Sequence, residues 1–323
     1  MIHQVLLSDA KTTEKEAIES ALDGVDARVR STVAHDEEAL RTEAAGASAL
    51  IVDANTPVTG DVLTSLSDLQ VVGRAGIGFD NVAVDVATDN GITVVNVPDY
   101  CIEEVSTHAL ALLFACLRRI TVYDSTVKDG TWEWTGGRPI PRLAGSTVGL
   151  FAFGKIGRRF AAKLRGFDID VVAYDPHVPD YRMDDLGVEP VGFDRLLSRS
   201  DILSVHAPLT DETRGTFDED AFEAMGDGAI LVNTARGPIV DEGALVDALE
   251  SGSIDAAGLD VRETEPPVNS PLNDRDDVVL SPHVGWYSEQ SRVELSQSVA
   301  SDVARVLRGE EPQNPVDPEP DWG

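Results

Sequence analysis

The chain has 323 residues, of which 42% are hydrophobic and 26% are charged; this composition excludes global disorder and fits about two folded domains. Its longest apolar run, residues 109–117, is far shorter than a membrane-spanning helix, and no basic start precedes an apolar stretch as in a secretory signal. We therefore expect a cytoplasmic protein. Its only cysteines, Cys101 and Cys116, are not spaced as metal ligands or as a disulfide framework, so no metal site is expected.

The charge balance is strongly acidic, with 57 Asp and Glu against 26 Lys and Arg and a formal net charge of −31. Such a field repels phosphates of nucleic acids and anionic membranes, so neither is an expected partner. The acids are spread along the chain, and an excess of this size destabilises a compact fold unless salt screens it. Since the Debye length is about 3 Å at 1 M salt, the sequence favours a halophilic protein. The alternative is a merely acidic mesophilic protein.

The N-terminal third alternates short apolar runs with amphipathic stretches. This alternation is typical of a parallel sheet with helices on both faces. Thr13 and Glu16 have the spacing of a capping box, which predicts a helix that starts there. The predicted strands of this series are residues 4–7, 49–52, 71–74 and 93–95.

A second series of strands follows a long apolar segment. That segment, residues 103–120, fits an almost wholly buried helix that passes from one domain to the other. Further along, Asp241 and Glu242 precede an apolar-periodic stretch, where the dipole of a helix favours acids. The predicted strands of this series are residues 148–151, 170–174, 202–206, 230–233, 258–261 and 278–281.

A last periodic segment, residues 288–307, suggests that the chain returns to its first domain. We therefore predict an α/β protein with two doubly wound parallel sheets. Residues 1–101 plus 287–323 form a discontinuous substrate domain, and residues 102–286 form an inserted nucleotide-binding domain. The cleft between two such domains is the expected ligand site.

A glycine-rich turn marks the nucleotide site. The strand at residues 148–151 runs into Ala152-x-Gly154-x-x-Gly157, and a helix follows. Gly154 lets the backbone approach a pyrophosphate at the helix N-terminus, and Gly157 lets the helix pack on the sheet. Asp175, 21 residues after Gly154, would accept hydrogen bonds from ribose hydroxyls and repel a 2′-phosphate, which predicts NAD as cofactor. A tight strand–helix turn without a ligand is the alternative.

Three chemically suited residues follow successive strands of the second domain, at the sheet edge where ligands bind. Arg236 offers a planar fork for a carboxylate, and His283 exchanges a proton near neutral pH. Glu265 would orient the imidazole and favour its protonated form. Taken singly, these residues also fit a strand-end cap, a loop histidine and a solvated loop acid.

At this point the chain resembles the D-isomer-specific 2-hydroxyacid dehydrogenase family over nearly its whole length. The resemblance implies a flavodoxin-like substrate domain, an inserted Rossmann domain and a homodimer built around the inserted domain. The motifs that carry it are residues 73–81, 152–157, 206–210, 233–237 and 281–283.

The resemblance also assigns roles to residues. It implies that Arg236 binds the substrate carboxylate, that His283 is the acid/base and that Glu265 pairs with His283. It implies a carboxylate-binding backbone at Ala75, Gly76, Ile77 and Gly78, while Trp286 is expected as an apolar wall for the substrate or a packing residue under the hinge. The cofactor-binding residues that it implies, with Asp260 at the nicotinamide carboxamide, are Gly154, Lys155, Ile156, Gly157, Asp175, His206, Ala207, Pro208, Thr213, Thr234, Ala235, Arg236, Asp260, His283 and Gly285.

Two branches of the family are most similar. Residues 96–101 and 283–290 resemble the branch of the C-terminal-binding proteins, which are NAD-sensing corepressors, and residues 74–78 also resemble phosphoglycerate dehydrogenases. Phosphoglycerate dehydrogenases usually carry a phosphate-binding arginine after the strand that corresponds to residues 49–52, where this chain has Asp53. The expected function is reversible NAD-dependent reduction of a 2-oxo acid to a D-2-hydroxy acid. A phosphoglycerate dehydrogenase and an NAD-responsive binding protein are the alternatives.

Overall fold

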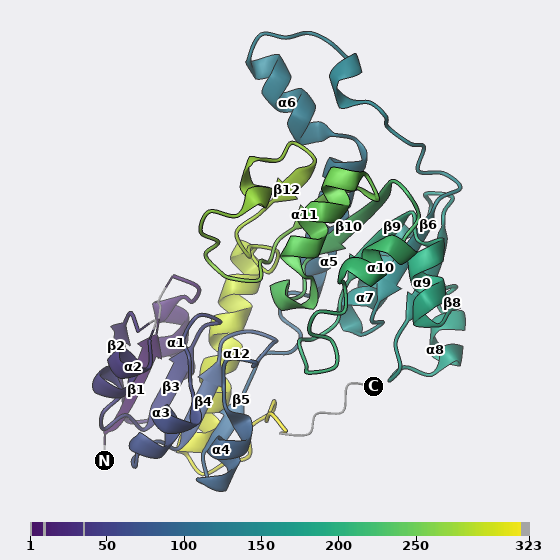
Figure 1. The fold of residues 1–323 in the computed structure, drawn as a ribbon. Coiled ribbons are helices and arrows are strands. Elements are labelled where there is room, and N and C mark those ends of the chain that lie inside the picture. Colours follow the sequence, from purple (N-terminus) through teal and green to yellow (C-terminus); the bar gives the residue numbers. More distant parts are fainter. Residues whose placement is uncertain (1, 9–10, 35, 318–323) are drawn as a thin grey trace. The chain divides into compact units, whose positions relative to one another are not determined.

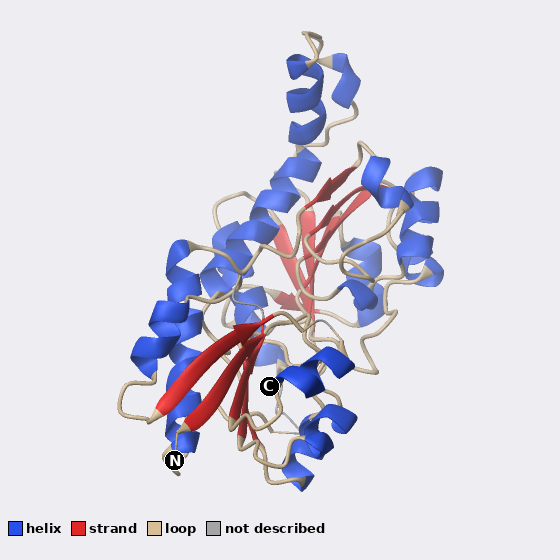
Figure 2. Ribbon diagram, turned by 90° about the vertical axis from the view of Figure 1, so that its left-hand side faces the viewer, coloured by secondary structure: helices blue, strands red, loops and turns tan. Residues whose placement is uncertain are grey.

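The computed structural model describes residues 2–8, 11–34 and 36–317, which fall into two compact units (Figure 1). Among these residues, the first unit contains those up to Cys101 and residues 287–317, and the second is Ile102–Trp286. Each unit has one parallel sheet with helices packed on both faces (Figure 2).

The first unit has a five-stranded parallel sheet in the order β2-β1-β3-β4-β5, the flavodoxin-like order. Helices α2, α3 and α4 cover one face and α12 covers the other. The elements of this unit are β1 (His3–Ser8), α1 (Lys15–Ala21), β2 (Ala27–Thr32), α2 (Glu37–Glu43), β3 (Ala49–Val52), α3 (Gly60–Ser65), β4 (Val71–Arg74), α4 (Val84–Asp89), β5 (Thr93–Val95) and α12 (Glu289–Leu307).

Helix α12 packs against α1 and β4 of the first unit. Ser288 caps it, because its hydroxyl accepts from the backbone N–H of Ser291. The helix lies so close to β4 that a Cβ on Gly73 would come within 2.8 Å of Val299 and 2.9 Å of Val303. The glycine therefore sets the distance between this helix and the sheet.

The first unit differs from the sequence analysis in two places: it has one strand that was not predicted, and it lacks one predicted helix cap. Strand β2 was not predicted, because it is an edge strand whose Arg28 and Arg30 break the apolar run. The predicted capping box is absent: α1 begins at Lys15, and the backbone N–H of Glu14 bonds Ser296 of α12 instead. A contact with a distant helix thus replaces the local cap.

The second unit has a seven-stranded parallel sheet in the order β12-β11-β10-β9-β6-β7-β8, which extends the Rossmann order by one strand. The two-residue strand β8, which contains a proline, was not predicted. The elements are α5 (Ile102–Leu117), α6 (Ile120–Lys128), β6 (Thr147–Phe151), α7 (Lys155–Leu164), β7 (Asp170–Tyr174), α8 (Asp180–Asp184), β8 (Glu189–Pro190), α9 (Phe193–Arg199), β9 (Ile202–Val205), α10 (Glu219–Ala224), β10 (Ala229–Asn233), α11 (Glu242–Ser251), β11 (Ile254–Leu259) and β12 (Val278–Leu280), with short 3-10 turns at Thr135–Gly137, Gly237–Ile239 and Pro271–Asp274.

Helix α5 belongs wholly to the second unit and is buried on one side, not almost all round as predicted. It packs closely on β11, where a Cβ on Gly258 would come within 2.9 Å of Leu112. Helix α6, which follows, has no buried residue and projects from the unit in Figures 1 and 2. Among the described residues no single helix is long and apolar enough to cross a membrane; α5 and α6 pass that test only as a pair bent by 63°.

Candidate active site

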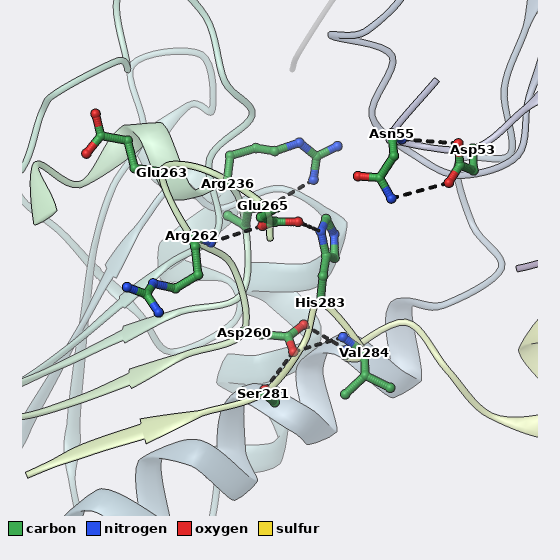
Figure 3. A network of polar contacts seen from close by, with 12 residues as sticks. Asp53, Asn55, Arg236, Asp260, Arg262, Glu263, Glu265, Ser281, His283 and Val284 are labelled. Atoms are coloured by element: carbon green, nitrogen blue, oxygen red, sulfur yellow. Dashed lines mark hydrogen bonds and ion pairs between the residues drawn. The ribbon is translucent and has the colours of Figure 1, made fainter. Parts of the chain in front are cut away.

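His283 and Glu265 are paired at the carboxyl ends of the seven-stranded sheet (Figure 3). Nδ1 of His283 donates to Oε2 of Glu265 over 2.7 Å, and the backbone N–H of Arg262 donates to Oε1 over 2.9 Å. Within the described part of the chain nothing bonds Nε2 of His283. The pair thus fixes one ring nitrogen and leaves the other available for proton exchange.

The carboxylate of Glu265 is held in its ionised form. Burial alone would raise the pKa of Glu265, but the hydrogen bond and charge of His283, the N–H of Arg262 and the charge of Arg236 hold this pKa below its usual value. The same hydrogen bond fixes the orientation of the imidazole ring of His283.

Arg236 lies beside this pair, in the loop that follows β10 (Figure 3). Its loop is fixed by Asn233, whose side-chain amide donates to the backbone oxygen of Arg236 over 2.9 Å. One guanidinium N–H reaches the carbonyl of Ala235 over 2.8 Å, and the side chain is only half-buried. A guanidinium placed there can bind a carboxylate next to the histidine.

Asp260 organises the loop that carries His283. Its buried carboxylate accepts from the hydroxyl of Ser281 (2.6 Å) and from the backbone N–H groups of Val284 (2.9 Å) and Gly285 (2.8 Å). Burial raises its pKa, but these bonds and His108 outweigh burial and lower the pKa of Asp260 to about 2. The carboxylate therefore stays ionised and keeps the loop in place at neutral pH.

The same loop holds His283 in an uncommon backbone conformation. Its φ is 52°, in the left-handed region that few non-glycine residues adopt, and its N–H donates to the carbonyl of Asp260 over 2.7 Å. Position 285 requires glycine, because a Cβ there would come within 2.8 Å of Asp260. Trp286 is partly buried at the end of the loop, which fits either predicted role.

In the first unit, the loop from Ala75 to Gly78 turns its carbonyls inward. The carbonyl of Ala75 accepts from Arg74 (2.5 Å), that of Gly76 from the N–H of Val97 (3.0 Å), and that of Ile77 from the side chain of Asn96 (2.7 Å). The N–H groups of Gly76, Ile77 and Gly78 make no hydrogen bond within the described residues. Successive unpaired N–H groups form a nest for an anion such as a carboxylate.

Asp53, at the end of β3, serves its own turn. Its buried carboxylate accepts from the hydroxyl of Thr56 (2.7 Å) and from the backbone N–H of Asn55 (3.1 Å) (Figure 3). The position where phosphoglycerate dehydrogenases usually carry an arginine is therefore occupied by a side chain that caps a turn.

The predicted dinucleotide turn has the expected backbone shape. Ala152 adopts a φ of 77°, a conformation that normally requires glycine, so alanine replaces the first glycine of the motif without changing the turn. Gly157 is required, since a Cβ there would come within 2.7 Å of the carbonyl of Ala152. A Cβ on Gly154 would meet no atom within 4 Å, so the start of α7, with Lys155 and Ile156 in its first turn, has open space beside it.

Asp175 follows β7 as predicted. Its carboxylate accepts from the backbone N–H groups of Phe153 (2.7 Å) and His177 (2.9 Å), which ties the ends of β6 and β7 together. The side chain is partly buried, and an ionised carboxylate still has capacity for hydroxyl donors.

Two of the predicted cofactor-binding residues have side-chain polar atoms without a hydrogen-bond partner among the described residues. The two ring nitrogens of His206, which are inaccessible to solvent although the residue is only partly buried, and the hydroxyl of buried Thr234 have no hydrogen-bond partner among the described residues. Burial lowers the pKa of His206 to about 3, so the ring is neutral. Thr213 fixes the neighbouring turn, since its hydroxyl donates to the carbonyl of Pro208 over 2.7 Å, and Ala207 is buried. Orphaned donors and acceptors beside an open helix N-terminus fit a bound dinucleotide.

Sequence reasoning missed the residues that support the site. His108 of α5 lies 2.8 Å from Ser281, and Arg262 forms an ion pair with Glu242. His108 and Ser281 are far apart in the chain. Sequence patterns reveal regular spacing within one helix or strand, but they do not reveal contacts between separate elements. No group of three or more His, Cys, Asp or Glu that could hold a metal ion occurs among the described residues.

Comparison with known proteins identifies the family. Residues 110–285 match the NAD-binding domain of D-isomer-specific 2-hydroxyacid dehydrogenases. The chain is 37% identical over 309 residues to the D-3-phosphoglycerate dehydrogenase of Archaeoglobus fulgidus (95% of this chain, 58% of that protein). It is 41% identical over 287 residues to that of Mycobacterium tuberculosis (89% and 54%), so it spans about half the length of these curated relatives.

Solved structures agree with this result over the whole chain. The TT0316 protein of Thermus thermophilus is 31% identical with a TM-score of 0.87 and coverage of 97% of this chain and 100% of that one. The D-lactate dehydrogenase of Aquifex aeolicus, solved with NAD and lactic acid, is 25% identical with a TM-score of 0.85 and coverage of 95% and 96%. The chain belongs to the D-isomer-specific 2-hydroxyacid dehydrogenase family.

Proposed function

We propose that this protein is an NAD-dependent D-2-hydroxyacid dehydrogenase that reversibly reduces a 2-oxo acid to the D-2-hydroxy acid. The observation that carries the proposal is the 2.7 Å pair of His283 and Glu265 beside Arg236, within an NAD-binding domain of this family. Bound NADH supplies the hydride that reduces the carbonyl carbon.

The side chains divide the remaining work. The guanidinium of Arg236 binds the substrate carboxylate through two parallel hydrogen bonds. Nε2 of His283 donates a proton to the carbonyl oxygen during reduction and accepts it during oxidation. Glu265 holds Nδ1 of that ring and stabilises its charge. The unpaired N–H groups of Gly76, Ile77 and Gly78 give a second carboxylate-binding element.

The proposed substrates are unphosphorylated 2-oxo acids with apolar side chains, with Trp286 as the wall of the side-chain pocket. Two features support this choice: position 53 carries an aspartate and not an arginine, and the net charge is −31. Both disfavour binding of a phosphorylated substrate. A second candidate is D-3-phosphoglycerate dehydrogenase, which is the name of the curated relatives at 37% and 41% identity.

Oxidation of NADH with a panel of 2-oxo acids in molar salt tests the proposal. We expect turnover of apolar 2-oxo acids and poor turnover of 3-phosphohydroxypyruvate. A strong preference for the phosphorylated compound would establish the second candidate. Tight binding of NADH without turnover of any 2-oxo acid would instead favour an NAD-responsive binding protein.

We further propose that the protein is a homodimer that uses α6 and the segment after it. In that region no residue of α6 is buried, and Trp132 and Trp134 are 87% and 68% exposed. Exposed aromatic side chains of this size are typical of interfaces. Light scattering after gel filtration should give twice the mass of 34.6 kDa, and Trp132→Ser with Trp134→Ser should give the monomer.

We also propose that the protein works in a cytoplasm of very high salt. The net charge of −31 favours this, because self-repulsion at low salt opposes a compact fold. As potassium chloride is diluted below molar levels, the protein should lose both its activity and its folded structure. Circular dichroism measures the loss of structure. Full activity and an unchanged Tm at about 50 mM salt would contradict the proposal.

A further inference from the structure

Arg262 and Glu242 form a buried ion pair close to the proposed acid/base residues. Arg262 follows β11, and Glu242 is the first residue of α11. Nε and Nη2 of the guanidinium donate to the two carboxylate oxygens of Glu242, each over 2.8 Å. The side chains are 5% and 18% exposed, so solvent screens this pair little.

The pair holds residues 262–273, within the segment between β11 and β12, together. The guanidinium of Arg262 also donates to Ser270 (2.6 Å) and Asn273 (3.0 Å), and the backbone N–H of Glu263 donates to Glu242 (2.9 Å). On its other side the backbone of Arg262 packs on Gly237, where a Cβ would come within 1.9 Å of the Arg262 carbonyl. The peptide that joins Arg262 to Glu263 is thus held on both sides, and the side chain of Arg262 is held by Glu242.

The backbone N–H of the same residue, in the preceding peptide, is one of the two anchors of Glu265. Oε1 of Glu265 accepts from the N–H of Arg262 over 2.9 Å, and Oε2 accepts from His283 over 2.7 Å. Among the described residues, its carboxylate makes no other hydrogen bond. Any shift of the Arg262 peptide therefore moves the carboxylate relative to the imidazole.

We propose that Glu242 and Arg262 are positioning residues of the acid/base pair: their ion pair holds the backbone of Arg262 where its N–H fixes Glu265 against His283. The inference rests on the proposed function and concerns the same site. The sequence favours Glu242 only as an acid at a helix N-terminus; the structure adds a partner 20 residues away in the chain.

The test follows the His283 ring by NMR titration and measures kcat for 2-oxo acid reduction on the same samples. In Glu265→Gln the ring should lose its proton at lower pH, by about one pH unit, because its anionic partner is gone. Glu242→Gln should shift the titration in the same direction by a smaller amount and lower kcat about tenfold, since small misplacements of catalytic groups are costly. Binding of NADH should stay unchanged in both variants.

A double variant separates positioning from a general structural role. If Glu242 acts through Glu265, Glu242→Gln should add nothing to the titration shift of Glu265→Gln in the double variant. Additive shifts, or wild-type titration and kcat in Glu242→Gln, would overturn the inference. Arg262→Lys, which keeps the charge but loses the fork, is the second variant and should behave like Glu242→Gln.

A matched control lies in the same unit. Arg275 donates two bonds to Asp277 over 2.9 and 2.8 Å, away from the Glu265 segment, and Asp277→Asn should leave titration and kcat unchanged. Misfolding of both Glu242→Gln and Arg262→Lys would overturn the inference in favour of a purely structural pair. If the wild-type protein reduces no 2-oxo acid but the coupled titration is observed, the proposed function fails and the positioning role stands.

Discussion

The candidate functional groups of the two units are built in different ways, from the backbone in one unit and from side chains in the other. In the five-stranded unit, residues 75–78 present only backbone N–H groups, and their carbonyls are tied inward by Arg74, Asn96 and Val97. In the seven-stranded unit, the segments after β10, β11 and β12 present the side chains of Arg236, Glu265 and His283, each set in a network of hydrogen bonds.

The difference shows what each kind of site requires. A backbone site depends on conformations that only glycine allows: Gly76 has a φ of 150°, and a Cβ there would come within 1.8 Å of Arg74. A side-chain site depends on supporting residues such as Asp260, which bonds Ser281, Val284 and Gly285. Substitutions in the backbone loop should therefore act on binding, and substitutions of Glu265 and His283 should act on proton transfer.

The largest effect is expected from His283→Asn. Proton transfer by a positioned side chain contributes about 10²–10⁴-fold, so kcat should fall by that factor in both directions. Fluorescence titration with NADH should show nearly unchanged cofactor affinity. A kcat within about threefold of the wild-type value would remove His283 from the mechanism.

The backbone loop is tested by Gly76→Ala. The added methyl group collides with the buried Arg74 side chain, so the N–H nest should distort and the KM for the 2-oxo acid should rise about tenfold or more. Gly91→Ala is the matched control in the same unit, because Gly91 also has a positive φ (70°) but no atom within 4 Å of a Cβ. The control should lose about 1 kcal/mol of stability and keep its KM. Equal KM values for the two variants would contradict the proposed role of the loop.

A smaller effect is expected for the choice between NADH and NADPH, which we assign to Asp175. Asp175 should favour the free ribose hydroxyl over a 2′-phosphate, so kcat/KM should be at least about tenfold higher with NADH than with NADPH. The nearby His177 could soften this preference, and Asp175→Asn should reduce it. Equal or better kcat/KM with NADPH in the wild-type protein would show that Asp175 does not decide cofactor choice.

Much of this architecture was predictable from the sequence, because its signals are local. Continuous apolar strands identified the two parallel sheets, and the residues that follow those strands included Arg236, Glu265 and His283. The edge strand β2 was not predictable in the same way, since its alternating arginines hide its strand character.

The supporting contacts were not predictable, because they join separate elements. Glu242 was interpreted as an acid favoured by the helix dipole, whereas Asp241 caps α11 and Glu242 pairs with Arg262. His108 and Ser281 are 173 residues apart, and nothing in either segment announces their contact. The conformation of Ala152 was also open, since a positive φ at alanine depends on the surrounding turn.

The pH dependence of Glu265→Gln tests the central claim most directly, because it removes the charge beside His283 and keeps the shape of the side chain. Without that carboxylate the imidazole should lose its proton earlier, so the alkaline limb of the reduction profile should move to lower pH. The oxidation profile should gain activity at its acidic end for the same reason. Steady-state kcat measured across pH in both directions gives the answer. If both limbs stay at their wild-type positions, Glu265 does not control the proton of His283 and the account is wrong.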